Sequence, residues 1–346
     1  MEKKKKIFYL DFIRVISMLM IVTYHFYVHF AENNIIGIKI FSNDKWGMIG
    51  VTLFFMISGA SLIYNYGENL DIKKYAKKRF LGIYPMFWIA YLLVFIYIFY
   101  GCKKILWDLP TNKLGISLLA MDGYLSPYTE TFYLIGEWFL GCIVLIYILF
   151  PILRTLFNKY PKTFFIVSTI INFALLIFYR NGIMPINKNL IVCTYSFILG
   201  MYIIKYIKNF KLWQMLITLS IAIIAYFIPA NNINIKVLIA NFIGYNLFIV
   251  LGYIGQKIEN ITIQKIFVTI SKYSYAVFLV HHYIIMKVEN TFQNTNLKLE
   301  ETICLYITCW IVISICAKIL YMINKSVLNF CKKEPKVELL EKANDR

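Results

Sequence analysis

Long runs of apolar residues separated by short polar segments repeat along the whole chain. A helix needs about 20 apolar residues to cross the hydrocarbon core of a membrane. Within the runs, apolar residues lie on every side and no period-two alternation is present, which favours helices over barrel strands. Ten predicted spans follow from this pattern: residues 7–29, 47–66, 83–100, 132–153, 163–180, 189–206, 212–229, 236–254, 268–287 and 301–323. The sequence therefore predicts an all-α integral membrane protein, a bundle of about ten transmembrane helices.

The basic residues between the spans predict how the chain is oriented. With the N-terminus inside, the inside segments carry 23 lysines and arginines and the outside loops carry 10. This bias predicts that both termini are cytoplasmic. No small-residue cleavage site follows the first span, so we interpret it as an uncleaved span and not a secretory signal. We expect a transmembrane domain at residues 1–324 and a basic cytoplasmic tail at residues 325–346.

Composition excludes several classes of protein. Residues are 60% hydrophobic and only 16% charged, against about a quarter charged in soluble domains, so a soluble protein is excluded. The net charge of +18 comes from short basic runs between apolar segments. We assign these runs to topology and to anionic lipid headgroups, and we expect no nucleic-acid partner. The seven cysteines show no metal-binding spacing, and we predict no metal. The abundance of Ile, Lys and Asn is typical of an AT-rich bacterial genome, and we expect the protein to lie in a bacterial plasma membrane.

The first span contains three ionisable residues that are costly in a bilayer: Asp11, Arg14 and His25. At about 100° per residue, Arg14 and His25 share one helix face, roughly 16 Å apart along the axis. Asp11 lies three residues before Arg14, on the same side. Intramembrane ionisable residues usually face a bundle interior or a cavity. A structural Asp11–Arg14 ion pair and an interfacial role for His25, like that of His29, remain the alternatives.

These residues also carry a resemblance to a known family. The L-D-x-x-R start followed by a histidine eleven residues after the arginine is similar to the first helix of the acyltransferase-3 family, specifically its shorter polysaccharide-modifying subgroup. Four further stretches resemble family elements in the expected order: GVTLFFMISGASLI (50–63), KKRFLGIYPMFW (77–88), EWFLGCIVLIYILFPIL (137–153) and SYAVFLVH (274–281). The resemblance implies a ten-helix membrane enzyme that transfers acyl groups, usually acetyl, from acyl-CoA to extracytoplasmic glycans. The chain departs from the family where Gly82 replaces a second arginine.

An acyl transfer to a hydroxyl needs a base and donors for the developing oxyanion. We predict His25 as the base, because neutral imidazole accepts a proton near neutral pH. Glu137 opens the fourth span at a similar depth and is predicted to orient the His25 ring. We place Asp11 with these two in the catalytic set. An interfacial carboxylate is the alternative for Glu137.

The charge of a residue and its depth in the membrane predict which substrate it contacts. Acyl-CoA carries phosphates, for which guanidinium groups are suited, so Arg14, Lys78 and Arg79 are the predicted donor-binding residues. A solvated inside loop is the alternative for the basic run. His281 is predicted to bind the acyl carbonyl or the acceptor, or else to contact a helix. His282 points about 100° away and ranks lower.

The function predicted from these residues is a membrane O-acyltransferase that uses acyl-CoA and acts on a polysaccharide or another cell-envelope glycan. The alternative is a multi-pass transporter or flippase for a glycan or lipid-linked precursor. Transport would favour matching halves with Gly- or Pro-interrupted helices, and the sequence shows none. A third possibility, a membrane sensor without catalytic activity, would not explain why Arg14 and His25 share one face of the first span.

Overall fold

The computed structural model describes residues 6–30, 44–101, 103, 109–180, 182–207, 209–292, 295 and 297–344. Across these residues the chain is helical and contains no strand. The main helices are α1 (Phe8–His29), α3 (Asp44–Tyr66), α4 (Ile72–Gly101), α7 (Trp138–Lys159), α8 (Pro161–Phe178), α9 (Leu190–Tyr206), α10 (Leu212–Phe227), α11 (Ile233–Lys257), α12 (Ile261–Phe292) and α13 (Leu299–Asn344). Short helices lie in two loops: η2 (Thr111–Lys113), α5 (Leu114–Leu118), α6 (Asp122–Leu125) and η3 (Ile186–Lys188).

Each of the ten predicted spans overlaps one long helix, which confirms the all-helical class. Seven helices among the described residues are long and apolar enough to cross a membrane: α1, α3, α4, α7, α8, α11 and α13. α9 and α10 are shorter apolar helices of 17 and 16 residues, and α12 is not among the seven. The count of ten crossings, the cytoplasmic termini and the division at residue 324 stay predictions.

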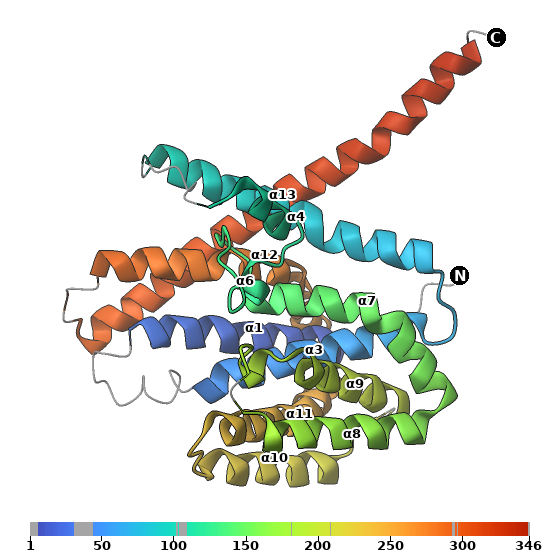
Figure 1. Cartoon of the computed structure of the whole chain (residues 1–346), viewed down its shortest axis with the longest axis vertical. Helices are drawn as coiled ribbons and strands as arrows, with labels where there is room; N and C mark the ends of the chain where they lie inside the picture. The colour runs from blue at the N-terminus through green and yellow to red at the C-terminus, as the bar shows by residue number, and fades with distance from the viewer. Residues whose placement is uncertain are drawn as a thin grey trace.

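Three helices begin six or more residues from the start that apolarity predicted. One of them is α12, which begins at Ile261 and not at residue 268. α4 begins at Ile72, well before the predicted span at 83, because lysine and alanine in KKYAKKR are good helix formers although they are not lipid-soluble. α7 begins at Trp138, six residues after the predicted start at 132. Residues 130–137 form no helix, and they bring Glu137 to the helix N-terminus. The predicted tail also continues α13 as far as Asn344, away from the bundle (Figure 1).

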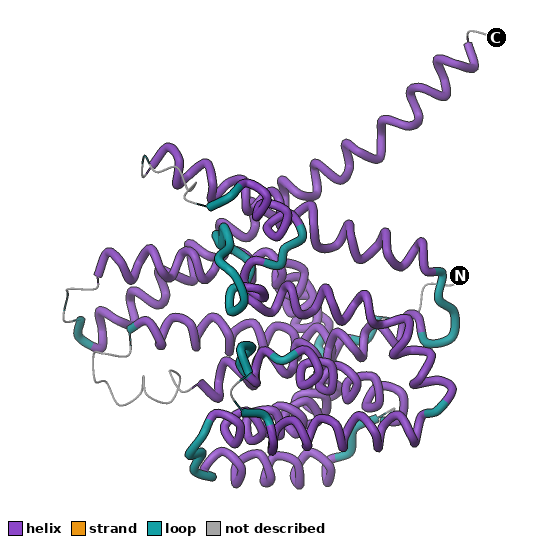
Figure 2. The backbone as a smooth tube through the Cα atoms, viewed as in Figure 1, coloured by secondary structure: helices purple, strands orange, loops and turns teal. Residues whose placement is uncertain are grey.

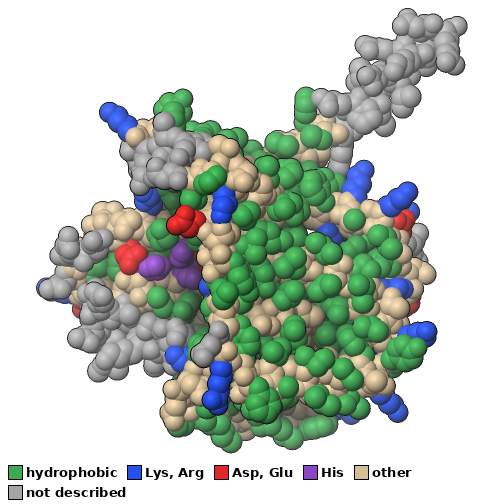
Figure 3. Space-filling view, in the orientation of Figure 1, with side chains coloured by type: hydrophobic (Ala, Val, Ile, Leu, Met, Phe, Trp, Pro, Cys, Tyr) green, Lys and Arg blue, Asp and Glu red, His purple; other side chains and the backbone are tan. Residues whose placement is uncertain are grey.

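Helix α1 lies in the interior of the bundle, against α3, α11 and α12 (Figures 1 and 2). In the most apolar stretch of each helix, 50% of the residues are buried in α1 and 67% in α3. The corresponding values are only 11% in α8 and 17% in α4. On the face drawn in Figure 3, apolar side chains cover most of the surface, and lysines and arginines lie mainly toward its edges. The ionisable residues of α1 therefore face protein, while the outer helices present apolar side chains to the surroundings.

Helices α3 and α9 approach each other closely at two glycines. A methyl group added at Gly59 would overlap the carbonyl oxygen of Phe197, and one added at Gly200 would overlap that of Met56. Small residues permit this close backbone approach in membrane bundles. The contact fixes α3 beside α1 and so positions the side chains between the two helices.

Candidate active site

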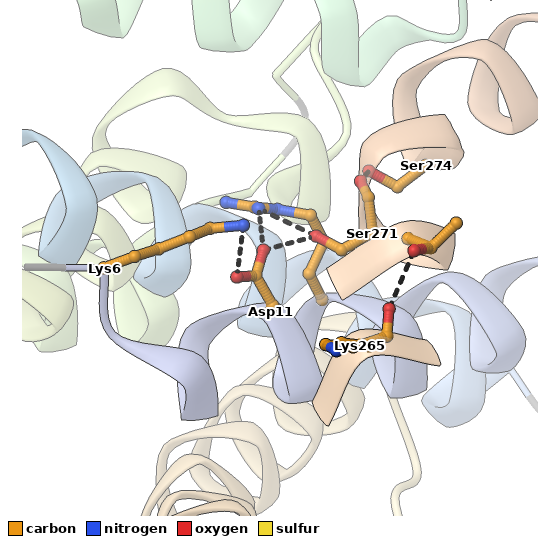
Figure 4. Close-up of polar contacts among 7 residues, drawn as sticks. Lys6, Asp11, Lys265, Ser271 and Ser274 are labelled. Atoms are coloured by element: carbon orange, nitrogen blue, oxygen red, sulfur yellow. Dashed lines mark hydrogen bonds and ion pairs between the residues drawn. The ribbon is translucent and has the colours of Figure 1, made fainter. Parts of the chain in front are cut away.

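One end of α1 holds Asp11 in a closed polar network (Figure 4). The Ser271 hydroxyl donates to Asp11 Oδ1 at 2.6 Å, and Lys6 Nζ lies 2.8 Å from Oδ2. Arg14 Nη1 donates to Asp11 Oδ1 at 3.2 Å and to Ser271 Oγ at 3.1 Å. Asp11 is only 3% exposed. Two cations balance its charge, and the Ser271 hydroxyl adds a hydrogen bond. The sequence reasoning named Asp11 and Arg14 but not Ser271, which α12 brings into contact.

A first cavity, of about 370 Å³, extends along α1 from this network toward His25. We call it the arginine cavity because Arg14 and Arg79 line it, together with His25 and Glu137. Arg14 and His25 are eleven residues apart on one helix, so the cavity follows roughly 16 Å of α1. The predicted shared face of Arg14 and His25 thus lines a single cavity.

Only part of the predicted basic cluster reaches this cavity. The Arg79 guanidinium lies 5.6 Å from the centre of the Tyr147 ring, and its Nε is buried without a hydrogen-bond partner in the described part of the chain. Lys78 is exposed, with its ammonium group 5.9 Å from the Tyr66 ring, and it is not among the lining residues. Gly82 does line the cavity, with open space where a side chain would extend. An unpaired buried guanidinium nitrogen beside Arg14 fits an anionic ligand such as a phosphate.

A second cavity, also of about 370 Å³, adjoins the first. We call it the asparagine cavity because Asn187 and Asn241 line it. The Thr52 hydroxyl donates to Asn241 Oδ1 at 2.8 Å, which fixes one polar wall. Lys188 also lines this cavity, with its ammonium group 5.9 Å from the Trp138 ring. The sequence alone gives no reason to pair Asn241 with Thr52, because the two residues are 189 positions apart.

The two cavities share part of their lining. His25, Glu137 and Trp138 line both of them, as do Ile21 and Val51. The His25 imidazole and the Glu137 carboxylate therefore lie where a ligand in one cavity could meet a ligand in the other. This junction is the feature that distinguishes the site from a single binding pocket.

Glu137 contacts a different histidine from the one expected. Its Oε1 lies 2.8 Å from Nδ1 of His282 and accepts a hydrogen bond from the Tyr133 hydroxyl at 3.1 Å. The His25 ring lies beside this pair, with its centroid 4.9 Å from that of His282. Glu137 is thus paired with His282 and not with His25, whose ring it was predicted to orient, because α12 turns His282 and not His281 toward α7. Two signals could have found these partners: the adjacent histidines at 281–282, and a tyrosine four residues before Glu137.

His281 is fully buried behind the junction. Its Nδ1 lies 2.8 Å from the Phe278 carbonyl oxygen and 3.1 Å from that of Val277, so it donates within its own helix. Its ring centroid lies 5.2 Å from that of His25, and it lines neither cavity. This position matches the alternative of a helix contact and supports the His25 ring from behind.

The loop before α7 holds Glu137 in place. Gly136 has a φ of +85°, a conformation that residues with a side chain rarely adopt. Gly123 of α6 packs directly against the backbone of residues 136–138, leaving no room for a methyl group. Burial raises the pKa of the Glu137 carboxyl, but the hydrogen bond from His282 and the nearby imidazoles lower it more, and the net pKa is well below its usual value. Glu137 therefore carries a negative charge at neutral pH.

These contacts define what the junction can do chemically. The described neighbours form no hydrogen bond with the His25 ring, so its lone pair is available to a ligand. The anionic Glu137 lies close enough to stabilise a positive charge on an imidazole. An acid–base reaction between a ligand in the arginine cavity and one in the asparagine cavity is compatible with this geometry.

The chain is similar in sequence to one protein family and to two named acyltransferases. The family profile described as an acyltransferase domain, that of the acyltransferase-3 family, matches residues 7–322. "Acyltransferase MdmB" of Streptomyces mycarofaciens is 26% identical over 138 residues, which cover 38% of this chain and 34% of that protein. The chain thus spans about a third of the length of this relative. A "Putative acetyltransferase ORF330" of Acidianus two-tailed virus is 25% identical over 271 residues, 74% of this chain and 77% of that protein.

No solved structure matches the chain. The family match covers nearly all of the sequence and includes every residue of both cavities. On this match, the protein belongs to the acyltransferase-3 family.

Proposed function

We propose that this membrane acyltransferase moves an acyl group, usually acetyl, from cytoplasmic acyl-CoA to a hydroxyl of an extracytoplasmic polysaccharide or other cell-envelope glycan in a bacterial plasma membrane. The junction of two cavities at His25 and Glu137 carries the proposal. A transferase with two substrates needs two binding spaces that meet at one reacting point. Family membership and the names of the two relatives support the acyl group as the transferred unit.

The arginine cavity is the donor site in this proposal. Arg14 and Arg79 would hold phosphates of the CoA moiety by charge-assisted hydrogen bonds. The length of the cavity along α1 suits an extended pantetheine arm, whose thioester would end near His25. Asp11 then acts through Arg14: it orients the guanidinium while Arg14 keeps other donors for the ligand. Lys78, which lies outside the cavity, has no direct contact in this arrangement.

The chemical step follows from the junction. His25 takes the proton of the acceptor hydroxyl while the oxygen attacks the thioester carbonyl carbon. Glu137 stabilises the imidazolium that forms and holds His282 beside it. When the new C–O bond has formed and the C–S bond breaks, the proton passes from His25 to the leaving thiolate. Products are an O-acyl ester and free CoA.

The asparagine cavity is the acceptor site. Its amide and hydroxyl groups suit the many hydroxyls of a sugar, and Trp138 offers an apolar surface for a sugar ring. Lys188 adds a positive charge beside Trp138. The Thr52–Asn241 hydrogen bond fixes the orientation of that amide, which favours a defined acceptor geometry.

Mass analysis of surface glycans from cells with and without the gene tests the proposal. Loss of an acyl mass from the surface glycan, restored by the wild-type gene and not by His25→Ala, is the expected result. Unmodified glycan retained inside the cell would instead favour the transporter alternative. Inverted vesicles supplied with isotope-labelled acetyl-CoA should place the label on luminal glycan. If labelled acetate without CoA labelled the glycan equally well, the donor assignment would be contradicted.

A further inference from the structure

Three histidines lie close together beside the junction of the two cavities. One ring nitrogen from each of His25, His29 and His282 lies within 4.8 Å of one from each of the others. The side chains of His29 and His282 are 20% and 26% exposed, so solution reaches them. Histidine side chains are visible beside acidic groups on the face drawn in Figure 3. Acyl transfer, as proposed above, uses only His25 of this group as a base and leaves His29 without a role.

Two of these imidazoles are already oriented by carboxylates. His29 Nδ1 lies 2.7 Å from Oε2 of Glu289, and His282 Nδ1 lies 2.8 Å from Oε1 of Glu137. Each Nδ1–H that donates to a carboxylate leaves Nε2 as the ring nitrogen with a free lone pair. Histidines that bind metals usually have this arrangement, with the second ring nitrogen donating to a carboxylate.

The electrostatics suit a divalent cation. Three neutral imidazoles supply no charge, while Glu137 and Glu289 each stand one hydrogen bond behind a ligand. The two carboxylates can balance a charge of +2 without contacting the ion. Three histidines with an open fourth position form a known zinc ligand set. At Zn–N distances of about 2.0–2.1 Å the nitrogens would stand roughly 3.3 Å apart. Starting from separations of up to 4.8 Å, the partly exposed rings need to approach each other by at most about 1.5 Å.

We propose that His25, His29 and His282 form a binding site for Zn²⁺ or a similar divalent transition metal, and that the bound ion withholds the His25 lone pair from acyl transfer. Imidazole nitrogen favours zinc, copper and nickel over magnesium or calcium. The inhibitory half rests on the proposed function, because it assumes that His25 is the base. The binding half rests on the geometry alone. This site was not foreseen from the sequence, since no metal-ligand spacing connects residues 25, 29 and 282.

Metal binding is measured first, without reference to activity. Purified full-length protein in detergent is stripped with EDTA, exchanged into buffer and titrated with Zn²⁺ by calorimetry, and with Co²⁺ by visible absorption. One ion per chain and a tetrahedral Co²⁺ spectrum are expected. His29→Gln should remove this site, and Glu289→Gln should weaken it about 10- to 100-fold through the lost hydrogen bond. Glu259→Gln, an exposed acid before the other end of α12, is the matched control and should change nothing.

Inhibition is measured second, on the same preparations. Zn²⁺ should stop acyl transfer by the wild-type protein, and EDTA should restore it. His29→Gln should transfer at the wild-type rate without metal and resist Zn²⁺ at concentrations that inhibit the wild type. Zinc affinity unchanged in His29→Gln would overturn the site, and transfer that requires zinc would overturn the inhibitory role. Zinc binding through His29 in a protein that transfers no acyl group would support the site and count against the proposed function.

Discussion

Asp11 and His25 lie toward opposite ends of α1 and differ in whether their side chains have hydrogen-bond or ion-pair partners. At the Asp11 end, each charge has a partner: Lys6 and Arg14 contact the carboxylate, and Ser271 closes the network. At the His25 end, the described neighbours leave the ring without a hydrogen bond, and two cavities open onto it. One helix thus carries a closed polar network and an open one, separated by roughly 16 Å.

The difference shows where polar groups stabilise and where they react. A buried charge whose partners are complete contributes to the fold and to the orientation of a neighbour. A buried imidazole without a partner keeps its lone pair for a ligand, at a cost in stability. On this comparison, substitutions at the closed end should affect folding first, and substitutions at the open end should affect chemistry first.

The strongest test of the open end is His25→Ala. Loss of a positioned general base should lower the rate of acyl transfer about 10²- to 10⁴-fold, while acetyl-CoA binding and the melting temperature stay close to wild type. Transfer is measured with isotope-labelled acetyl-CoA, and donor affinity by calorimetry. His29→Ala, one helical turn away and lining neither cavity, is the matched control. Wild-type transfer by His25→Ala would exclude His25 as the base.

The closed end is tested by Asp11→Ala. Removing the carboxylate leaves Arg14 and Ser271 without their shared acceptor, which should cost about 3 kcal/mol of stability. A lower melting temperature in detergent is the readout. Lys6→Gln is the control, because the Lys6 side chain is 60% exposed and exposed ion pairs contribute little. A fully stable Asp11→Ala that transfers no acyl group would reverse the comparison and place Asp11 in the chemistry.

The arginine cavity extends between the Asp11 end and the His25 end of α1. Its proposed role in binding acyl-CoA is tested by substituting the neighbouring cations Arg79 and Lys78. Arg79→Gln should weaken acetyl-CoA binding about 10- to 100-fold, as expected for the loss of a charge-assisted hydrogen bond. Lys78→Gln should change the affinity by less than twofold, since Lys78 does not line the cavity. Equal losses in the two variants would mean that overall positive charge, and not the cavity, attracts the donor.

The packing beside α1 is tested at the glycines. Gly59→Ala forces a methyl group against the Phe197 carbonyl and should cost about 1–3 kcal/mol. The thermal midpoint in detergent should fall accordingly. Gly82→Ala meets open space and should keep the wild-type midpoint. If both variants melt alike, α3 and α9 are less tightly fixed than the open end requires.

The smallest effect concerns Asp122, which lies in the loop that supports Glu137. Burial raises the pKa of Asp122 to about 6, and the Ser117 hydroxyl, which donates at 3.0 Å, offsets part of that increase. An unfolded Asp has a pKa of about 3.9, so the folded state binds more protons and stability falls as pH rises from about 4 to 6. Asp122→Asn removes this loss and should raise the melting temperature more at pH 7.5 than at pH 5.

A gain in melting temperature that does not change with pH would show that Asp122 does not titrate in this range. Ser117→Ala provides the control. Without its hydroxyl donor the charged form loses support, so the decline with rising pH should become steeper than in the wild type.

Local sequence is sufficient to predict the helical membrane class, the ten main helices among the described residues and the shared face of Arg14 and His25. These features depend on local composition and on the 100° turn per residue, which any helix obeys. The tertiary structure decided which residue of each basic or histidine pair faces the site: Arg79 and not Lys78, His282 and not His281. Adjacent residues on a helix differ by 100° in direction, and only the packing of neighbouring helices selects between them.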